Sequence, residues 1–312
     1  GGGGGGRGAR RLSGVGSGLA SGVALPAALG VTAGMRVAYP HLRAWLPAVL
    51  GGVVLLLVLT EGSTCRRLAG AFTFALATAL GLVALDAPTD PLVAAGGVLA
   101  PLFAGLFGVP VLVDALRGAG VPPQADARLG LSGRELAGSA VAGAGGGAAV
   151  GYLPGVSAGV AAVLALPATA GRDPAREYVV ATSGANTATA VFALFAYWAF
   201  DVTRSGVFVA MDDASVSAVL PPLVTALLIA GAVGTVGVVL LGDAALRTVG
   251  ALPHAPLVAG VLIGLALLSL AFVGPIGLLV LVAAAAVGFV PVRLGCRRVH
   301  LMGVLLGPLV LA

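Results

Sequence analysis

Long uncharged apolar runs recur along this chain of 312 residues and leave few folds open to it. The stretch from Ala214 to Leu241 holds no charged residue, and across the chain 59% of residues are hydrophobic while 9% are charged. Such a chain has too little polar surface to cover a water-soluble core. In hydrocarbon, every backbone N–H and C=O group must be paired internally, so spanning segments are helices or a closed barrel. Because the runs lack the alternation of barrel strands, the sequence predicts an all-α, polytopic integral membrane protein.

Charged and proline-rich breaks divide the chain into about nine candidate spans of roughly 20 residues each. They cover approximately residues 12–37, 44–60, 67–85, 91–113, 178–200, 214–241, 255–272 and 275–291, with a last segment from about 301. Residues 114–135 form a polar loop between membrane segments. We expect a single transmembrane transporter domain over residues 1–312, multi-pass in the cell membrane. Six leading glycines without an initiating methionine indicate a truncated N-terminus.

Residues 136–171 have a length that fits neither one span nor two. An uncharged stretch of about 35 residues is too long for one span, yet too short for two spans of ~20 residues and a turn. Arginine counts in the loops balance only if this stretch returns to the side it left. At its centre is GYLPGVSAG, where Pro154–Gly155 should break the helix, since proline lacks an N–H and glycine tolerates positive φ. The sequence predicts a re-entrant helical hairpin, and a proline kink in an ordinary helix pair is the alternative.

The hairpin tip and the span after it supply the candidate site. Backbone N–H groups freed at the break, with the helix N-terminus near Ser157, suit an anion, while freed carbonyls suit a cation such as sodium. The following span contains ATSGANTATA, in which Ser183 and Asn186 share one helix face. An amide inside a membrane needs hydrogen-bond partners. These residues therefore predict a binding site, and hydrogen bonding between packed helices is the alternative interpretation.

Other chemistries find little support in the sequence. Cys65 and Cys296 show no CxxC spacing and no histidine cluster, so we expect no disulfide framework, metal site or cofactor. The arginines are spread over short connections rather than along a stripe, which argues against nucleic acid. An enzyme would need a nucleophile with a base, or paired carboxylates, at membrane depth, whereas His41 and His300 lie in arginine-bearing loops. We expect a carrier for a small anionic solute; a passive channel or an accessory membrane subunit without its own substrate site is the alternative.

Five segments, taken in order, resemble one transporter family. They are LTEGSTCRRLAGAFTFALATALGL, LFAGLFGVPVLV, GYLPGVSAG, the ATSGANTATA helix and RRVHLMGVLLGPLVL. Together they resemble the large membrane subunit of tripartite tricarboxylate transporters, the TctA-like permeases, and are closer to shorter archaeal members than to bacterial citrate carriers. The likeness covers nearly all of the chain from Glu61 onward, and the order of the segments carries it.

This resemblance implies secondary transport of a di- or tricarboxylate, driven by a Na⁺ or H⁺ gradient. It also implies two partners, a small membrane subunit and an extracytoplasmic solute-binding protein. Members of the family carry two related Pro-Gly motifs. The first is absent here, and Gly14–Gly22 is its candidate remnant. The family also tends to have an Asn-Asn pair in the helix after the second motif, where this chain has the single asparagine Asn186. Carried over residue by residue, the hairpin tip consists of Gly151, Pro154, Gly155 and Ser157, and it is faced by Ser183, Asn186 and Thr187.

Overall fold

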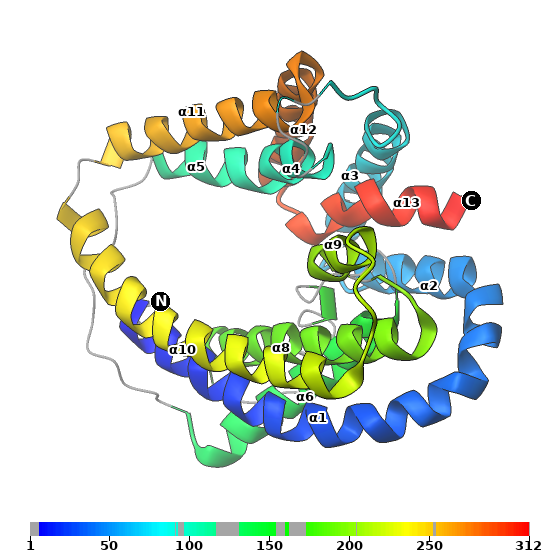
Figure 1. The fold of residues 1–312 in the computed structure, drawn as a ribbon. Helices are drawn as coiled ribbons and strands as arrows, with labels where there is room; N and C mark the ends of the chain where they lie inside the picture. Colours follow the sequence, from blue (N-terminus) through cyan, green and yellow to red (C-terminus); the bar gives the residue numbers. More distant parts are fainter. Residues whose placement is uncertain are drawn as a thin grey trace. The chain divides into compact units, whose positions relative to one another are not determined.

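The computed structural model describes residues 6–90, 92, 97–116, 131–153, 160–161, 173–203, 205–251 and 254–311. Within these ranges all regular secondary structure is helical, as predicted (Figure 1). Seven of the described helices are long and apolar enough to cross a membrane. They contain the segments Ser17–Tyr39, Thr64–Ala84, Leu99–Leu116, Ala175–Phe200, Leu220–Val238, Ala255–Val273 and Pro275–Leu294. The all-α prediction is therefore confirmed for the described residues, and the seven helices agree with a multi-pass membrane protein.

Contacts divide the chain into two compact units, each built from two stretches of sequence. Unit 1 consists of Gly1–Ala44 and Pro122–Gly250, and unit 2 of Trp45–Val121 and Ala251–Ala312. Because a division by contacts does not define independent folding, the expectation of a single transmembrane domain stays a prediction.

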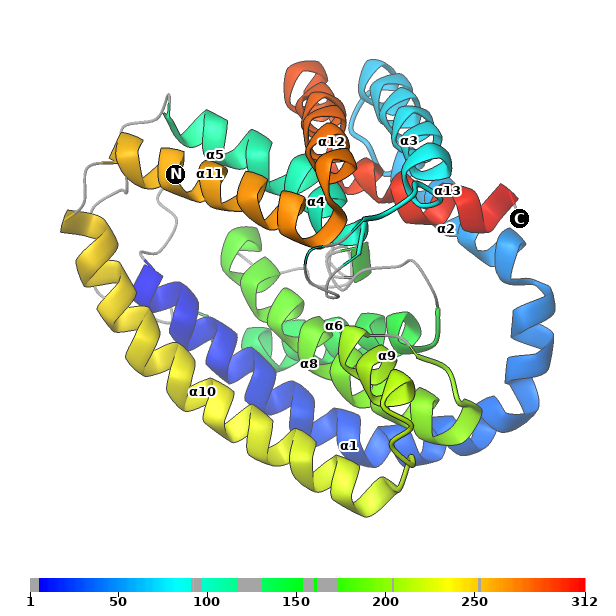
Figure 2. The ribbon, with the colours of Figure 1, turned by 45° about the horizontal axis from the view of Figure 1, so that its top comes forward.

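The helices of unit 1 are held together around α8. They are α1 (Gly6–Ala44), α6 (Gly133–Tyr152), α8 (Pro174–Phe200), α9 (Gly206–Asp213) and α10 (Leu220–Ala251). The first three pack against one another pairwise, while α10 lies alongside α1 (Figures 1 and 2). The apolar core of the unit is formed mainly by residues 191–197 in the second half of α8, together with Ala20, Ala24 and Ala28 of α1.

Small residues allow α6 and α8 to approach closely. Ser139, Gly143, Gly147 and Gly151 recur every four residues and form one buried face of α6. A Cβ atom on Gly143 or Gly147 would overlap a backbone carbonyl oxygen of α8. Small residues at four-residue spacing are typical of tightly packed membrane helices. Packing against α8 thus explains Gly143, Gly147 and Gly151.

The ends of α6 and α8 follow from their sequences. Ser132 caps α6, because its hydroxyl accepts the Glu135 N–H while the Glu135 carboxylate accepts the Ser132 N–H. This helix ends at Tyr152, immediately before the predicted break. The break itself and most of the predicted returning arm lie outside the described residues. Asp173 caps α8 ahead of Pro174, and α8 ends where Asp201 takes a left-handed φ of 53°.

Unit 2 contains the remaining helices, in which α13 packs most closely against α3, and α12 against η1. Its elements are α2 (Leu46–Leu59), α3 (Thr64–Ala84), α4 (Leu99–Phe103), the π-helical turn η1 (Ala104–Gly108), α5 (Val109–Leu116), α11 (His254–Val273), α12 (Pro275–Leu294), the 3₁₀ turn η3 (Arg298–Met302) and α13 (Gly303–Leu311). Close approaches again occur at glycine: a Cβ on Gly303 would lie 2.6 Å from the carbonyl oxygen of Phe74. The hydroxyl of Thr78 also lies 3.2 Å from the carbonyl oxygen of Gly303, which it can reach as a donor.

Several predicted boundaries differ from the structure. The first helix does not end near residue 37 but continues to Ala44, where Trp45 separates it from α2. Two of the nine predicted spans are short: α2 has 14 residues, or ~21 Å at 1.5 Å per residue, and α13 has 9. A ~30 Å hydrocarbon core needs about 20. The predicted loop is shorter than 114–135, since α5 runs to Leu116 and α6 begins at Gly133; residues 117–130 lie outside the described ranges.

Candidate functional site

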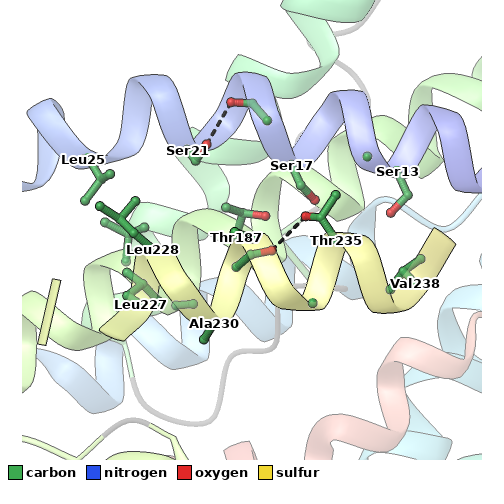
Figure 3. A pocket seen from close by; sticks show the side chains of 17 residues that line it. Ser13, Ser17, Ser21, Leu25, Thr187, Leu227, Leu228, Ala230, Thr235 and Val238 are labelled. Carbon is green, nitrogen blue, oxygen red and sulfur yellow. Dashed lines mark hydrogen bonds between the residues drawn. The ribbon is translucent and has the colours of Figure 1, made fainter. Parts of the chain in front are cut away.

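A cleft of about 560 Å³ opens in unit 1 between α1, α8 and α10 (Figure 3). The first of these helices contributes Ser13, Gly14, Ser17, Gly18, Ser21 and Leu25; α8 contributes Thr187, Ala190 and Val191; and α10 contributes Leu227, Leu228, Ala230, Gly231, Ala232, Gly234, Thr235 and Val238. None of these side chains is charged. The cleft therefore combines apolar walls with a few hydroxyl groups, a pattern common in binding sites for small molecules.

The hydroxyls of α1 follow its helical repeat. Ser13, Ser17 and Ser21 are four residues apart, so they stack along one side of the helix and line the cleft together. Figure 3 shows Ser17 facing Thr235 of α10 across the cleft. The Ser21 hydroxyl donates to the carbonyl oxygen of Gly18 (2.9 Å) and the Thr235 hydroxyl to that of Gly231 (2.8 Å). Both donors can turn toward a ligand by giving up only a local bond.

A hydroxyl network connects α8 to the cleft. The oxygen of Ser183 lies 2.7 Å from that of Ser13 and 2.9 Å from the carbonyl oxygen of Val179. Since Ser183 carries one hydroxyl proton, it can donate to only one of them at a time. When it donates to Val179, it can accept the proton of Ser13. Thr187, one turn further on, donates to the carbonyl oxygen of Ser183 (3.0 Å).

Glycine keeps the cleft wide on two of its walls. A Cβ atom added at Gly14, Gly18, Gly231 or Gly234 would meet no other atom within 4 Å, so each of these positions borders open space. The hydroxyl groups of the site offer donors for an anion and oxygen acceptors for a cation.

The predicted site residues divide into four groups. Thr187 lines the cleft, and Ser183, which is 8% exposed, contacts it through Ser13. Asn186, predicted to share their face, is exposed and is not among the lining residues. Gly151 is buried in α6, where a Cβ would overlap Phe192 of α8. Pro154, Gly155 and Ser157 lie outside the described residues.

Sequence reasoning missed several polar groups of unit 1. The serines of α1 carried a usable signal, because they recur every four residues: Ser17 and Ser21 lie within the candidate remnant Gly14–Gly22, and Ser13 lies just before it. Thr235 gave no such signal, because a single threonine in an apolar helix is common. Glu177, in the first turns of α8, is 1% exposed, and its Oε1 has no hydrogen-bond partner among the described residues. Within that part of the chain, no three His, Cys, Asp or Glu residues are grouped as metal ligands would be.

Comparison with known proteins identifies a family that the chain matches over most of its length. Residues 3–303 match the family model described as the tripartite tricarboxylate transporter TctA family. No curated protein and no solved structure matches the chain. The matched range contains every residue that lines the cleft and reaches into both units.

Proposed function

Since this chain belongs to the tripartite tricarboxylate transporter TctA family, we propose that it is itself the secondary-active permease, carrying a di- or tricarboxylate across the cell membrane at the expense of an ion gradient. Membership makes it a component of tricarboxylate transport, in a family of transporters rather than of enzymes. Its seven long apolar helices agree with a multi-pass membrane protein.

The observation that carries this proposal is the hydroxyl-lined cleft of unit 1. An accessory subunit would need no cavity of this kind, whereas a permease must enclose its solute within apolar surroundings. The volume of about 560 Å³ lies within the usual range of small-molecule sites, roughly 300–1,000 Å³. Ser183 and Thr187, chosen as site residues from the sequence, contact or line it.

The chemistry of the cleft supports ion coupling. A hydrogen bond to a charged group contributes about 1.5–3 kcal/mol, so the hydroxyls of Ser17, Thr187 and Thr235 can hold one carboxylate. No lining residue is basic, and further negative charges in an apolar cleft are unfavourable unless they are paired. We infer that Na⁺ or H⁺ enters with the solute and neutralises part of its charge.

The remaining sequence predictions belong to the same proposal. The end of α6 at Tyr152 supports a re-entrant hairpin broken at Pro154–Gly155, with Ser157 starting the returning arm. The two short apolar helices, α2 and α13, complete a set of about nine membrane segments in this scheme. A small membrane subunit and an extracytoplasmic solute-binding protein are the proposed partners, the latter delivering the solute.

Uptake into proteoliposomes tests the proposal. The purified protein is reconstituted and supplied with labelled di- and tricarboxylates, with and without sodium and proton gradients. Accumulation above the external concentration that depends on a gradient is the expected result. Flux that only equalises the two concentrations would indicate a passive channel. No flux by correctly inserted protein, also after addition of the partner subunits, would refute permease activity.

Two neighbouring residues of α8 distinguish the cleft from a site built around the asparagine. Thr187→Val removes a hydroxyl that lines the cleft, whereas Asn186→Ala alters an exposed side chain beside it. If the solute binds in the cleft, the first variant raises KM several-fold and the second leaves it nearly unchanged. The reverse order would place the site at the face of α8 that carries Asn186.

A further inference from the structure

The lining of the unit 1 cleft changes in character along its length. On α1 the hydroxyls of Ser13, Ser17 and Ser21 come first, and Leu25 is the last residue of this helix in the lining. At about 1.5 Å per residue, Ser13 and Leu25 are ~18 Å apart along the helix axis. The α1 wall of the cleft therefore runs from three hydroxyls to a leucine.

The α8 wall changes in the same direction. The hydroxyl oxygens of Ser13 in α1 and Ser183 in α8 lie 2.7 Å apart, and further along both helices the rings of Tyr39 and Phe200 stack with centroids 4.7 Å apart. The two helices are therefore parallel. The α8 residues of the lining follow in the order Thr187, Ala190 and Val191. On this wall too, the hydroxyl comes before the aliphatic side chains.

Helix α10 runs antiparallel to the other two and completes the same division. Figure 3 shows Thr235 facing Ser17, while Leu227 and Leu228 lie toward Leu25. Because α10 runs in the opposite direction, its leucines precede its threonine in the sequence and still lie beside the leucine of α1. All three walls thus place their hydroxyls toward one end of the cleft and aliphatic side chains toward the other.

The cleft accordingly has a hydroxyl end and an aliphatic end. The hydroxyl end consists of Ser13, Ser17, Ser21, Thr187 and Thr235. The aliphatic end consists of Leu25, Val191, Leu227 and Leu228. The side chains of the aliphatic end offer neither a hydrogen-bond donor nor a charge.

The two ends favour different parts of a solute. A carboxylate at the aliphatic end would lose its hydration without gaining a side-chain donor, which is strongly unfavourable. At the hydroxyl end the same group can accept several hydrogen bonds. A CH₂ group that moves from water to the aliphatic end is stabilised in proportion to the apolar area removed from water. The lining therefore suits a solute with its carboxylates at one end and an apolar group at the other.

We propose that the cleft selects carboxylates that carry an apolar arm, with the carboxylates at the hydroxyl end and the arm against Leu25, Leu227 and Leu228. This proposal rests on the proposed permease function and narrows its solute class. A dicarboxylate with carboxylates on neighbouring carbons and an alkyl group on one of these carbons has the required shape. A compact hydroxylated acid such as citrate has no apolar arm to place against the leucines.

Binding to a homologous series of dicarboxylates tests the proposal without transport. The series is succinate, methylsuccinate, propylsuccinate and pentylsuccinate, with malate as the hydroxylated counterpart of succinate. Isothermal titration calorimetry of the full chain in nanodiscs gives a Kd for each acid, and empty nanodiscs correct for partition into lipid. Each CH₂ group added to the arm should tighten binding roughly two- to fourfold. Malate should bind no more tightly than succinate.

Two neighbouring residues of α10 form a matched pair of variants. Leu228 and Ile229 are 51% and 59% exposed, and of these two only Leu228 lines the cleft. Leu228→Ala shortens the aliphatic end, so the preference for pentylsuccinate over succinate should fall at least about threefold. Ile229→Ala should keep every Kd within about twofold of the unaltered protein. Ser17→Ala, at the hydroxyl end, should weaken the whole series by a similar factor of roughly two to ten.

The outcomes separate this proposal from the permease function. A Kd that does not fall with arm length, tighter binding of malate than of pentylsuccinate, or equal effects of Leu228→Ala and Ile229→Ala would overturn the proposed selectivity. If a gradient drives succinate uptake in proteoliposomes while the arm gives no advantage, the permease function stands and the selectivity fails. If the series binds as expected but no gradient drives uptake of any member, the permease function fails and the selectivity of the cleft stands.

Discussion

Replacing Thr235 by valine tests the cleft with the smallest change that the structure allows. Valine keeps the shape of threonine and removes only the hydroxyl. A hydrogen bond from that hydroxyl to a carboxylate contributes about 1.5–3 kcal/mol, but forming it gives up the present bond to the carbonyl oxygen of Gly231, worth about 1 kcal/mol. The net loss of about 0.5–2 kcal/mol corresponds to a KM for uptake raised roughly 2- to 30-fold.

Thr225 provides the matched control in the same helix. It is exposed, it lies outside the cleft, and its hydroxyl makes the same kind of bond, to the carbonyl oxygen of Pro221 at 2.9 Å. Initial rates of labelled carboxylate uptake in proteoliposomes give KM and the maximal rate for both variants, at equal amounts of inserted protein. Thr225→Val should change KM less than about twofold. Equal effects of the two substitutions, or no effect of Thr235→Val, would refute the assignment of the cleft.

Three further predictions concern stability, each measured by thermal unfolding of the purified protein in detergent. Gly143→Ala should destabilise unit 1 by about 1–3 kcal/mol, because the added Cβ overlaps α8. Position 145 of the same helix borders open space, so Gly145→Ala should stabilise unit 1 by about 0.5–1 kcal/mol. Similar changes in melting temperature for the two variants would contradict the described packing of α6 on α8. Tyr152→Phe should destabilise by about 1 kcal/mol, because it removes the buried 2.8 Å hydrogen bond to Thr32; an unchanged melting temperature would argue against that bond. Burial raises the pKa of Glu61, but hydrogen bonds from the Arg297 N–H and from His300 outweigh burial, so the pKa is lowered from its unfolded value of about 4.5. The ionised carboxylate therefore stabilises the fold above that pH, and the effect is lost as pH falls through the folded pKa. Glu61→Gln should therefore be less stable than the unaltered protein at pH 7, and the deficit should shrink as the pH is lowered below 4.5. A deficit that does not change with pH would exclude this origin.

The sequence predicted those helices best whose ends are marked by residues of strong local effect. The span 275–291 corresponds to α12, which begins at Pro275, and 178–200 corresponds to α8, which ends at Phe200, just before Asp201. Where the signals were weak, prediction failed: the first span was expected to end near residue 37, yet α1 continues to Ala44. Helix ends depend on local chemistry, whereas the continuation of a helix through a polar stretch depends on what it packs against.

The candidate site was predictable only in part, because it is assembled from distant segments. Ser183 and Thr187 drew attention as hydroxyls in an apolar span, but their partner Ser13 is 170 residues from Ser183. Glu61 and His300 are 239 residues apart, and nothing near either of them indicates that they meet. The closer likeness to archaeal members, the re-entrant hairpin and the role of Asn186 stay predictions.

The α10 side of the cleft separates the cleft from the surrounding lipid. None of its span Leu220–Val238 is buried within the chain, and its outer side presents large apolar residues such as Ile229, Val233 and Val236. In a bilayer, acyl chains contact this surface, and lipid is about as apolar as the side chains it would replace. Displacing α10 therefore removes little buried apolar surface from within the protein. We therefore expect the thickness of the surrounding lipid to influence the width of the cleft.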